Sequence, residues 1–215
     1  VSSEVLAVAG RIFPSTAANV ALEATLEDGT KVTGETRISK SRQRIRRIAL
    51  KPGGSRPLRE TLEAIARADL ITLGPGSLYT SVIPNLLVEG IPAALRKSAA
   101  AKAYVVNLMW QPGETMGYSA SDHVRAILAH SCPGLLDYAV VNTRPIRPAL
   151  RRKYARQMAQ PVAMDTARLR ELGLQVIEAD LAGQEAVVRH DPAALAAALI
   201  GLAQAKRGRP QPRAR

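Results

Sequence analysis

From residue 69 onward the chain alternates short apolar segments with helical ones, and no other feature of the sequence constrains the fold as much. The apolar segments have the length of buried strands and lie at residues 70–73, 104–108, 138–141 and 175–178. Helical spacing of apolar residues is clearest at residues 92–101, 122–129, 166–172 and 192–203. Strand and helix in regular alternation predict a parallel sheet with helices on both faces. We therefore predict a Rossmann-like, three-layer α/β fold.

The first fifty residues predict antiparallel β structure instead. Residues 20–26 alternate imperfectly between apolar and polar, Asp28-Gly29 is a strong hairpin turn, and residues 31–38 supply a return strand. Further along, a short strand is expected at residues 45–50 and a helix at residues 58–67. We expect a β-hairpin appendage at about residues 18–50.

Length and composition narrow the class of protein. A chain of 215 residues with 47% hydrophobic content can bury one sizeable core, so we expect a single domain over residues 1–205. No apolar stretch is long enough to span a bilayer, and no signal peptide opens the chain. These observations favour a cytoplasmic protein with no membrane span.

The net charge of +12 is concentrated in two segments. Six Lys and Arg residues lie at positions 37–47 without an acid, and five lie at positions 206–215, which we expect to be a disordered basic tail. The rest of the chain is nearly neutral, and neither segment has aromatic residues that could stack on bases, so nucleic acid is disfavoured as a partner. The run at 37–47 could dock an acidic partner or contact another subunit, although a solvated face is the simpler interpretation.

The loop after the first predicted strand is the strongest candidate for a ligand-binding element. Gly74, Pro75, Gly76 and Ser77 follow that strand directly. Pro75 fixes one backbone angle, the glycines adopt angles that other residues avoid, and Ser77 is placed to cap the next helix. Several free N–H groups can then point at one anion, so a phosphate-bearing ligand is expected. A tight strand-to-helix turn explains Gly-Pro-Gly alone equally well.

Polar side chains continue beyond this loop, more of them than a turn needs. They are Ser77, Tyr79, Thr80, Ser81 and Asn85. The segment lacks the Lys-Ser/Thr of a P-loop, the third glycine of a dinucleotide fingerprint and the elbow that would make Ser77 a nucleophile. It therefore indicates binding of a small polar ligand without a standard nucleotide signature.

Polar residues also follow the second and third predicted strands. They are Asn107, Gln111, Glu114 and Thr115 after the second strand, and Asn142, Thr143 and Arg144 after the third. Ligands of open α/β sheets bind beyond the carboxyl ends of the strands. If these strands are neighbours, one crevice gathers the glycine loop, two asparagines, an acid and an arginine, which suits a nucleotide-like ligand.

Other chemistries find less support. The histidines are His123, His130 and His190, and neither their spacing nor the single cysteine favours a metal site, so no metal is expected. We expect His123 near a helix start and His130 near its end, where a positive charge suits the helix dipole. Glu114 and Asp122 could form a carboxylate pair for acid–base chemistry, but a solvated or capping pair is the simpler interpretation.

Several longer motifs are similar to known proteins. Residues 74–87 (GPGSLYTSVIPNLL), 107–115 (NLMWQPGET) and 119–124 (SASDHV) resemble the CofD-like superfamily and, within it, the YvcK-type gluconeogenesis factors of bacteria. Residues 10–16 and 189–192 are similar too, so the resemblance covers most of the chain. The family's glycine-rich first turn and its Asp-Asp-Gly-Gly-Ser stretch are absent. We therefore expect this chain to be the larger, C-terminal portion of a longer protein.

The resemblance implies a cytoplasmic regulator that binds a nucleotide sugar, UDP-N-acetylglucosamine being the expected ligand, with no cofactor and no reaction of its own. It implies a link between gluconeogenic carbon metabolism and cell-wall synthesis and cell shape, through a cell-wall or regulatory protein partner. A homo-oligomer is left open.

The family's ligand-binding tyrosine and arginine fall on Tyr154 and Arg189. A tyrosine ring can stack on uracil, and a guanidinium can pair with a diphosphate. A half-buried tyrosine and a salt-bridged arginine are the structural alternatives. The complete set of expected ligand-binding residues is Gly74, Pro75, Gly76, Ser77, Thr80, Asn107, Thr115, Asn142, Tyr154 and Arg189.

The alternative function is enzymatic. The other branch of the superfamily is the CofD-type 2-phospho-L-lactate transferase, which moves a phospholactyl unit from a guanosine diphosphate-linked donor to a deazaflavin acceptor. Such enzymes are similar in fold but usually carry asparagine after the Gly-Pro, where this chain has Gly-Ser-Leu-Tyr. Kinship of fold is weak evidence for function.

Overall fold

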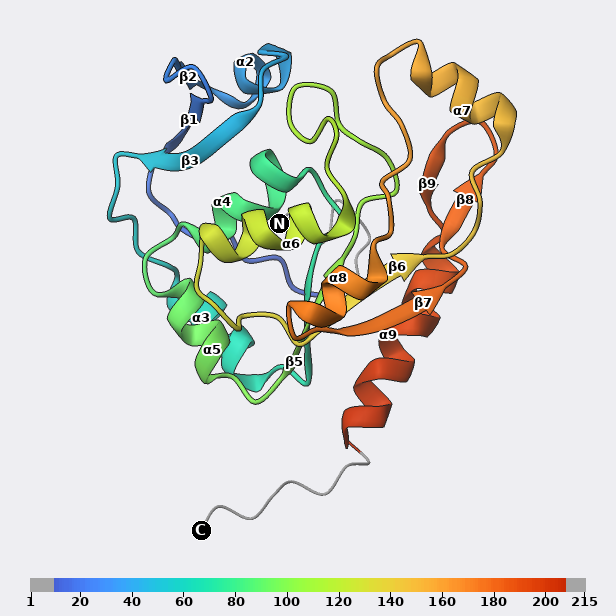
Figure 1. Ribbon diagram of the computed structural model, residues 1–215. Coiled ribbons are helices and arrows are strands. Elements are labelled where there is room, and N and C mark those ends of the chain that lie inside the picture. The colour runs from blue at the N-terminus through green and yellow to red at the C-terminus, as the bar shows by residue number, and fades with distance from the viewer. Residues whose placement is uncertain (1–9, 208–215) are drawn as a thin grey trace.

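The computed structural model describes residues 10–207, and its strands form three sheets over that range (Figure 1). The parallel sheet has the order β4-β5-β6-β7, with strands Leu70–Leu73, Ala101–Val105, Tyr138–Asn142 and Gln175–Ala179. The small antiparallel sheet has the order β2-β1-β3, with strands Lys31–Thr33, Ala21–Leu26 and Ile45–Lys51. β8 (Ala182–Gln184) and β9 (Val188–His190) form a separate hairpin.

Short helices lie between these strands, and a longer one, α9, follows the last strand. They are α2 (Glu35–Lys40), α3 (Arg59–Arg67), the π-helical turn η1 (Leu78–Val82), α4 (Ile83–Leu86), α5 (Ile91–Lys97), α6 (Ala120–Ala129), α7 (Pro148–Ala155), α8 (Thr166–Glu171) and α9 (Pro192–Arg207). Among the described residues, no single helix is long and apolar enough to cross a membrane. One pair of helices, Leu78–Leu86 and Ile91–Lys97, meets the length and composition of a membrane span only when the two are taken together, and they are bent by 74°.

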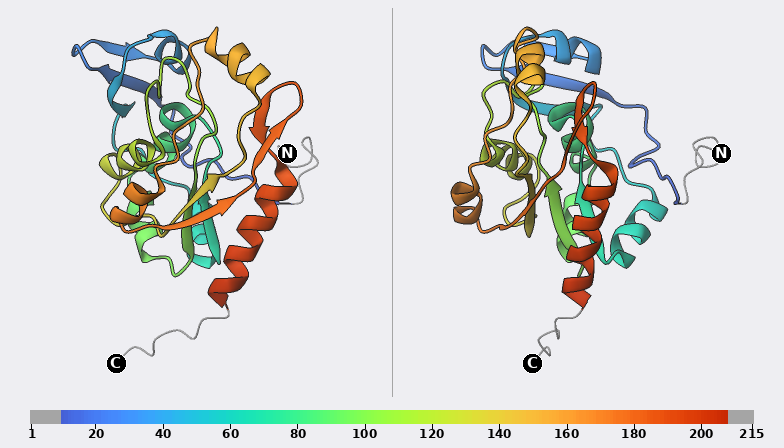
Figure 2. Two further views of the ribbon diagram at one scale, coloured as in Figure 1. Left: turned by 45° about the vertical axis from the view of Figure 1, so that its right-hand side comes forward. Right: turned by 90° about the vertical axis from the view of Figure 1, so that its right-hand side faces the viewer.

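Both faces of the parallel sheet are covered. Successive side chains of its central strands point to opposite sides, so each of these strands contributes to a core on either face. Tyr104 of β5 and Ala139 of β6 belong to the core that includes Ile127 of α6. Ala103 and Val140, from the same strands, belong to a second core with Leu195 of α9. Figure 2 shows α9 along one face and α6 with α8 on the other. The predicted three-layer α/β fold with an antiparallel β segment near its start is confirmed.

The boundaries around β5 differ from the prediction. The helix expected at 92–101 ends at Lys97, and the strand expected at 104–108 starts at Ala101 and ends at Val105. Ser98 has an extended backbone, and its Oγ donates to Ile65 O (2.9 Å) and accepts from Ala100 N (3.2 Å), which ends the helix. β5 begins with alanine and lysine, which favour helices in isolation, but here it is buried on both faces.

The return strand predicted at 31–38 is also shorter than expected. β2 ends at Thr33, and Gly34, with a φ of 97°, starts α2. Ile38 of α2 is fully buried in the main core, so packing favours a helical turn over a longer hairpin. β3 pairs with β1 from Ile45 to Lys51, with one register shift that leaves Arg46 without a partner, so the predicted hairpin is part of a three-stranded sheet.

The end of the chain is only partly described. Lys206 and Arg207, expected in a disordered tail, are the last residues of α9. The rest of that prediction, residues 208–215, lies outside the described residues.

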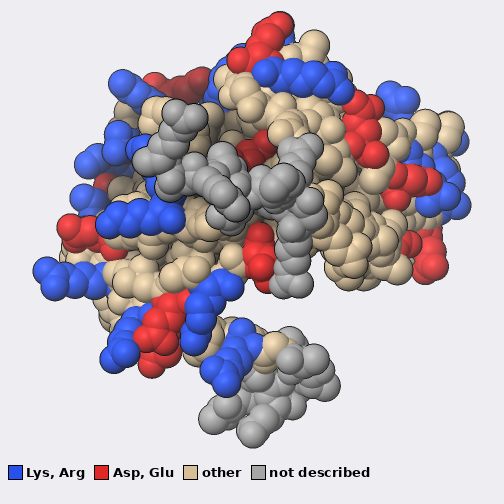
Figure 3. Space-filling view, turned by 90° about the horizontal axis from the view of Figure 1, so that it is seen from below, with Lys and Arg blue, Asp and Glu red and all other residues tan. Residues whose placement is uncertain are grey.

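Seen from below, basic and acidic side chains are intermixed on the surface and form no continuous basic face in that view (Figure 3).

Candidate functional site

A cleft of about 550 Å³ lies beyond the carboxyl ends of β4 and β5. Its lining residues are Pro75, Gly76, Ser77, Asn107, Leu108, Met109, Gln111, Val188, Arg189 and His190. They come from the loop after β4, the segment after β5 and strand β9. This is the position at which a parallel sheet binds its ligands. We refer to this pocket as the carboxyl-end cleft.

The glycine loop is held in place by the backbone around it. Gly74 has a φ of 79°, and a Cβ there would lie 3.3 Å from Val105 O, so glycine suits both the angle and the close approach of β5. Asn107 Nδ2 donates to Gly76 O (2.9 Å), and Asn107 Oδ1 accepts from Tyr104 Oη (2.8 Å). The side chain of Asn107 therefore fixes the loop against β5.

Ser77 does not form the predicted cap. It occupies the N-cap position of η1 without a side-chain cap bond, and its Oγ accepts from Gln111 Nε2 (2.6 Å). Within residues 10–207, the N–H groups of Gly76 and Ser77 donate to no other group. Gln111 Oε1 is buried without a hydrogen-bond partner there. The lining of the cleft thus includes two backbone donors without a partner among the described residues and a glutamine whose acceptor oxygen is buried and unpaired there.

Thr80, Glu114 and Thr115 lie behind the cleft and connect its loops. The buried carboxylate of Glu114 accepts from Tyr79 N (3.1 Å), Thr80 Oγ1 (3.0 Å) and Ser39 Oγ (3.2 Å). Burial raises the pKa of Glu114, against these hydrogen bonds, which lower it. Thr115 is fully buried, and its Oγ1 accepts from Gln111 N (3.0 Å). The structure places both threonines in the scaffold of the cleft and not in its lining.

Asn142 and Arg144 do not reach the cleft. Asn142 Oδ1 accepts from Arg144 N (3.1 Å) and Leu181 N (3.0 Å), and its Nδ2 donates to Arg144 O (2.7 Å). Arg144 pairs with Asp180 (3.5 Å). The predicted convergence of three strand ends therefore holds for the ends of β4 and β5 but not for the end of β6. The third wall comes from β9, which the sequence analysis did not recognise as a strand.

Arg189 and Tyr154 lie on the two sides of the hairpin strand β9. Arg189 is exposed, lines the cleft and forms no ion pair within the described part of the chain. Tyr154 of α7 is half-buried against Leu108 and Val188 and is not part of the lining. Its Oη accepts from Val188 N (3.0 Å), so the ring supports the strand that carries Arg189.

Helix α7 holds this hairpin at further points. Arg147 N donates to Gln184 Oε1 (2.6 Å), Arg147 Nη2 donates to Glu185 O (2.9 Å), and Lys153 Nζ donates to Ala186 O (3.1 Å). The sequence analysis did not predict this helix. The signal that could have found it is Pro148, a residue type favoured in the first turn of a helix, followed by the basic run at 151–153.

The histidines are structural. His190 is half-buried, its Nε2 lies 3.2 Å from Val106 O, and burial lowers its pKa. His130 ends α6 as predicted, but burial lowers its pKa as well, and its Nε2 accepts from Ile48 N (3.1 Å). An accepting Nε2 requires the neutral ring, so the expected charge–dipole interaction is wrong. His123 is fully buried in α6, and burial lowers its pKa too.

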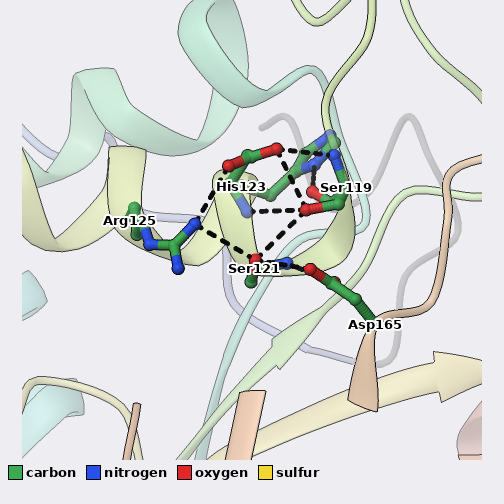
Figure 4. A network of polar contacts seen from close by, with 6 residues as sticks. Ser119, Ser121, His123, Arg125 and Asp165 are labelled. Carbon is green, nitrogen blue, oxygen red and sulfur yellow. Dashed lines mark hydrogen bonds and ion pairs between the residues drawn. The ribbon is translucent and has the colours of Figure 1, made fainter. Parts of the chain in front are cut away.

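The start of α6 is fixed by a polar network (Figure 4). Ser119 and Asp122 form a reciprocal capping box, which confirms capping as the role of Asp122. Ser121 Oγ donates to Asp165 (2.6 Å) at the start of α8, and Arg125 pairs with Asp122 (3.1 Å). Among the described residues, no three His, Cys, Asp or Glu side chains are grouped as a metal site would require.

Fold and cleft together define an α/β protein with a crevice at the carboxyl ends of parallel strands. Residues 1–182 match the family described as 2-phospho-L-lactate transferase CofD. The chain is 45% identical to a gluconeogenesis factor of Halalkalibacterium halodurans, over 92% of its length and 62% of that protein, and 44% identical to the one of Bacillus subtilis, over 93% and 63%. A crystal structure of a Bacillus halodurans protein, 44% identical, matches with a TM-score of 0.88 over 93% of this chain and 64% of that one.

The chain therefore belongs to the CofD family. It spans less than two thirds of the length of these relatives.

Proposed function

We propose that the carboxyl-end cleft binds a nucleotide sugar of the UDP-N-acetylglucosamine type and that the protein acts as a metabolic regulator. The observation that carries this proposal is that Arg189, which is exposed and forms no ion pair within the described residues, lines the same cleft as Gly76 and Ser77, whose N–H groups have no partner there. A guanidinium and backbone N–H groups are complementary to a diphosphate. The volume of about 550 Å³ is within the range of small-molecule sites.

The side chains that line the cleft favour binding over catalysis. Among the described residues, those that line the cleft include no carboxylate, lysine or cysteine. Ser77 Oγ accepts its hydrogen bond from an amide, which is no general base, and the Nε2 of His190 faces a backbone carbonyl.

The regulatory part of the proposal rests on the relatives named gluconeogenesis factor. We propose that a cytoplasmic regulator of this kind couples gluconeogenic carbon metabolism to cell-wall synthesis and cell shape, through a protein partner that responds to the bound nucleotide sugar.

The direct test is calorimetric titration of UDP-N-acetylglucosamine, UDP and GDP into the 215-residue chain. The proposal predicts saturable binding of the UDP sugar, weaker binding of UDP and weakest binding of GDP. No detectable heat with the UDP sugar, together with tight binding of GDP, would contradict it.

The family description favours a second candidate, transfer of a phospholactyl group from a guanosine diphosphate-linked donor to a deazaflavin alcohol. Mass spectrometry of the chain incubated with both substrates tests it. Formation of the phospholactylated deazaflavin would establish the transferase and overturn the non-catalytic proposal.

A further inference from the structure

A second pocket, of about 360 Å³, lies between the start of β3 and helix α6. Arg44, Arg46, Tyr118, Arg125 and His130 contribute to its walls. No residue that lines the carboxyl-end cleft lines this pocket. We call it the arginine pocket.

The arginine pocket carries an excess of positive charge. Arg44 and Arg46 are exposed and form no ion pair within residues 10–207, while Arg125 is paired with Asp122 (3.1 Å). The two unpaired arginines flank Ile45, the first residue of β3, and both line the pocket. Two guanidinium groups of like charge at one pocket disfavour each other until an anion lies between them.

The head group of Arg44 has a defined position at the pocket. A Cβ added to Gly117, which has a φ of 79°, would lie 3.2 Å from Arg44 Nη2, so the guanidinium lies over the bare backbone of this glycine. Tyr118 and Tyr79 line the same pocket; their Oη atoms are 2.9 Å apart, and Tyr79 Oη donates to Ile45 O (3.4 Å). Because Tyr79 Oη donates to Ile45 O, Tyr118 Oη donates to Tyr79 Oη, and the guanidinium groups are the donors left for phosphate oxygens.

We propose that the arginine pocket binds the phosphate group of a small phosphorylated metabolite. The pocket is concave, and its volume is at the lower end of the range for small-molecule sites, which favours a phosphate ester over the flat contact of an acidic protein surface. Arg44 and Arg46 bind the phosphate oxygens, and the tyrosine pair lies beside the ester group. This site accounts for two of the six cations in the basic run at 37–47.

The chain contains a reporter for this site. Trp110 is its single tryptophan, and its Nε1 donates to the backbone oxygen of Tyr118 (2.9 Å). Titration of inorganic phosphate, glucose 6-phosphate and glucose, followed by Trp110 fluorescence, is therefore the test. We expect saturable changes with both phosphates, tighter binding of the ester, and none with glucose. A response to inorganic phosphate alone would overturn the assignment of a phosphorylated metabolite.

Charge-matched variants locate the binding. Arg44→Gln with Arg46→Gln removes two charges from the pocket, and Arg37→Gln with Lys40→Gln removes two exposed charges from α2, outside its lining. We expect the first pair to weaken glucose 6-phosphate binding at least ~10-fold and the second to change it less than about twofold. Equal losses in both pairs, with unchanged thermal unfolding, would show a diffuse charge effect and overturn the proposal.

Discussion

The phenolic oxygen of Tyr154 lies 3.0 Å from the backbone nitrogen of Val188 and accepts its hydrogen bond. Val188 is the first residue of β9, and the next residue is Arg189, the only cation that lines the carboxyl-end cleft within residues 10–207. Tyr154, on α7, packs against the buried cluster to which Val188 belongs. This contact connects an element outside the cleft to the position of the residue that we propose binds the diphosphate.

Tyr154→Phe tests this connection. The substitution keeps the ring and leaves the buried N–H of Val188 unpaired, so we expect unfolding free energy to fall by about 1–3 kcal/mol. Because β9 is then held less firmly, affinity for UDP-N-acetylglucosamine should fall roughly fivefold, which corresponds to about 1 kcal/mol. Calorimetry and thermal unfolding measure the two effects. Unchanged affinity in Tyr154→Phe, together with loss of binding in Tyr154→Ala, would instead indicate direct stacking of the ring on the ligand.

Gly113 is where the loop after β5 approaches α2. A Cβ there would lie 2.1 Å from Ser39 O, and its φ is 82°. Gly134 has a similar φ of 68° but nothing within 4 Å of an added Cβ. Both alanine substitutions incur a backbone cost of about 1–2 kcal/mol. We expect Gly113→Ala to lose ~2 kcal/mol more than Gly134→Ala in urea unfolding, because the backbones must separate. Equal losses would contradict the close approach.

Stability should fall as the pH drops below about 6.5, the ordinary pKa of histidine. Burial lowers the folded-state pKa of His123, His130 and His190. Between the unfolded and folded pKa values the unfolded chain binds more protons, so the stabilising contribution is present above that window and is lost as the pH falls through it. The pKa of Glu114 is raised, so this group makes the protein less stable as the pH rises above the ordinary pKa of glutamate. Its effect on the pH dependence opposes that of the three histidines.

His130→Asn tests the share of one histidine. Urea unfolding between about pH 5.5 and about pH 7.5, roughly one unit either side of the ordinary pKa, should show a smaller pH slope than in the parent chain. A parent chain whose stability does not vary over this range would contradict the neutral, buried state of these rings.

The sequence predicted the sheet well because its strands are continuous apolar segments. β4, β6 and β7 lie within a residue of the predicted segments, at Leu70–Leu73, Tyr138–Asn142 and Gln175–Ala179. β5 was displaced because it begins with Ala101 and Lys102, residues typical of helices. Lys102 is tolerated there because its Nζ donates to Ser98 O (3.2 Å) and Ala100 O (3.0 Å).

The candidate cleft was predictable only in part. The position of the Gly74–Ser77 loop follows from topology, since the strand before it is recognisable. Asn107, Thr115 and Asn142 were chosen as polar residues at strand ends, yet their side chains bond to the backbone or to neighbouring loops. Sequence shows which residues can donate or accept a hydrogen bond, but only the fold shows which of those groups remain free. The contribution of β9 was missed because its three residues carry no periodicity.

The most direct measurement for the proposed function is the affinity of Arg189→Ala for UDP-N-acetylglucosamine, compared with Arg168→Ala. Both residues are exposed arginines, but Arg168 lies on α8, outside the cleft. A charge-assisted bond to phosphate contributes about 1.5–3 kcal/mol, so the account predicts at least about tenfold weaker binding for Arg189→Ala and unchanged binding for Arg168→Ala. Equal affinity in the two variants and the parent chain would contradict binding of the diphosphate in the carboxyl-end cleft.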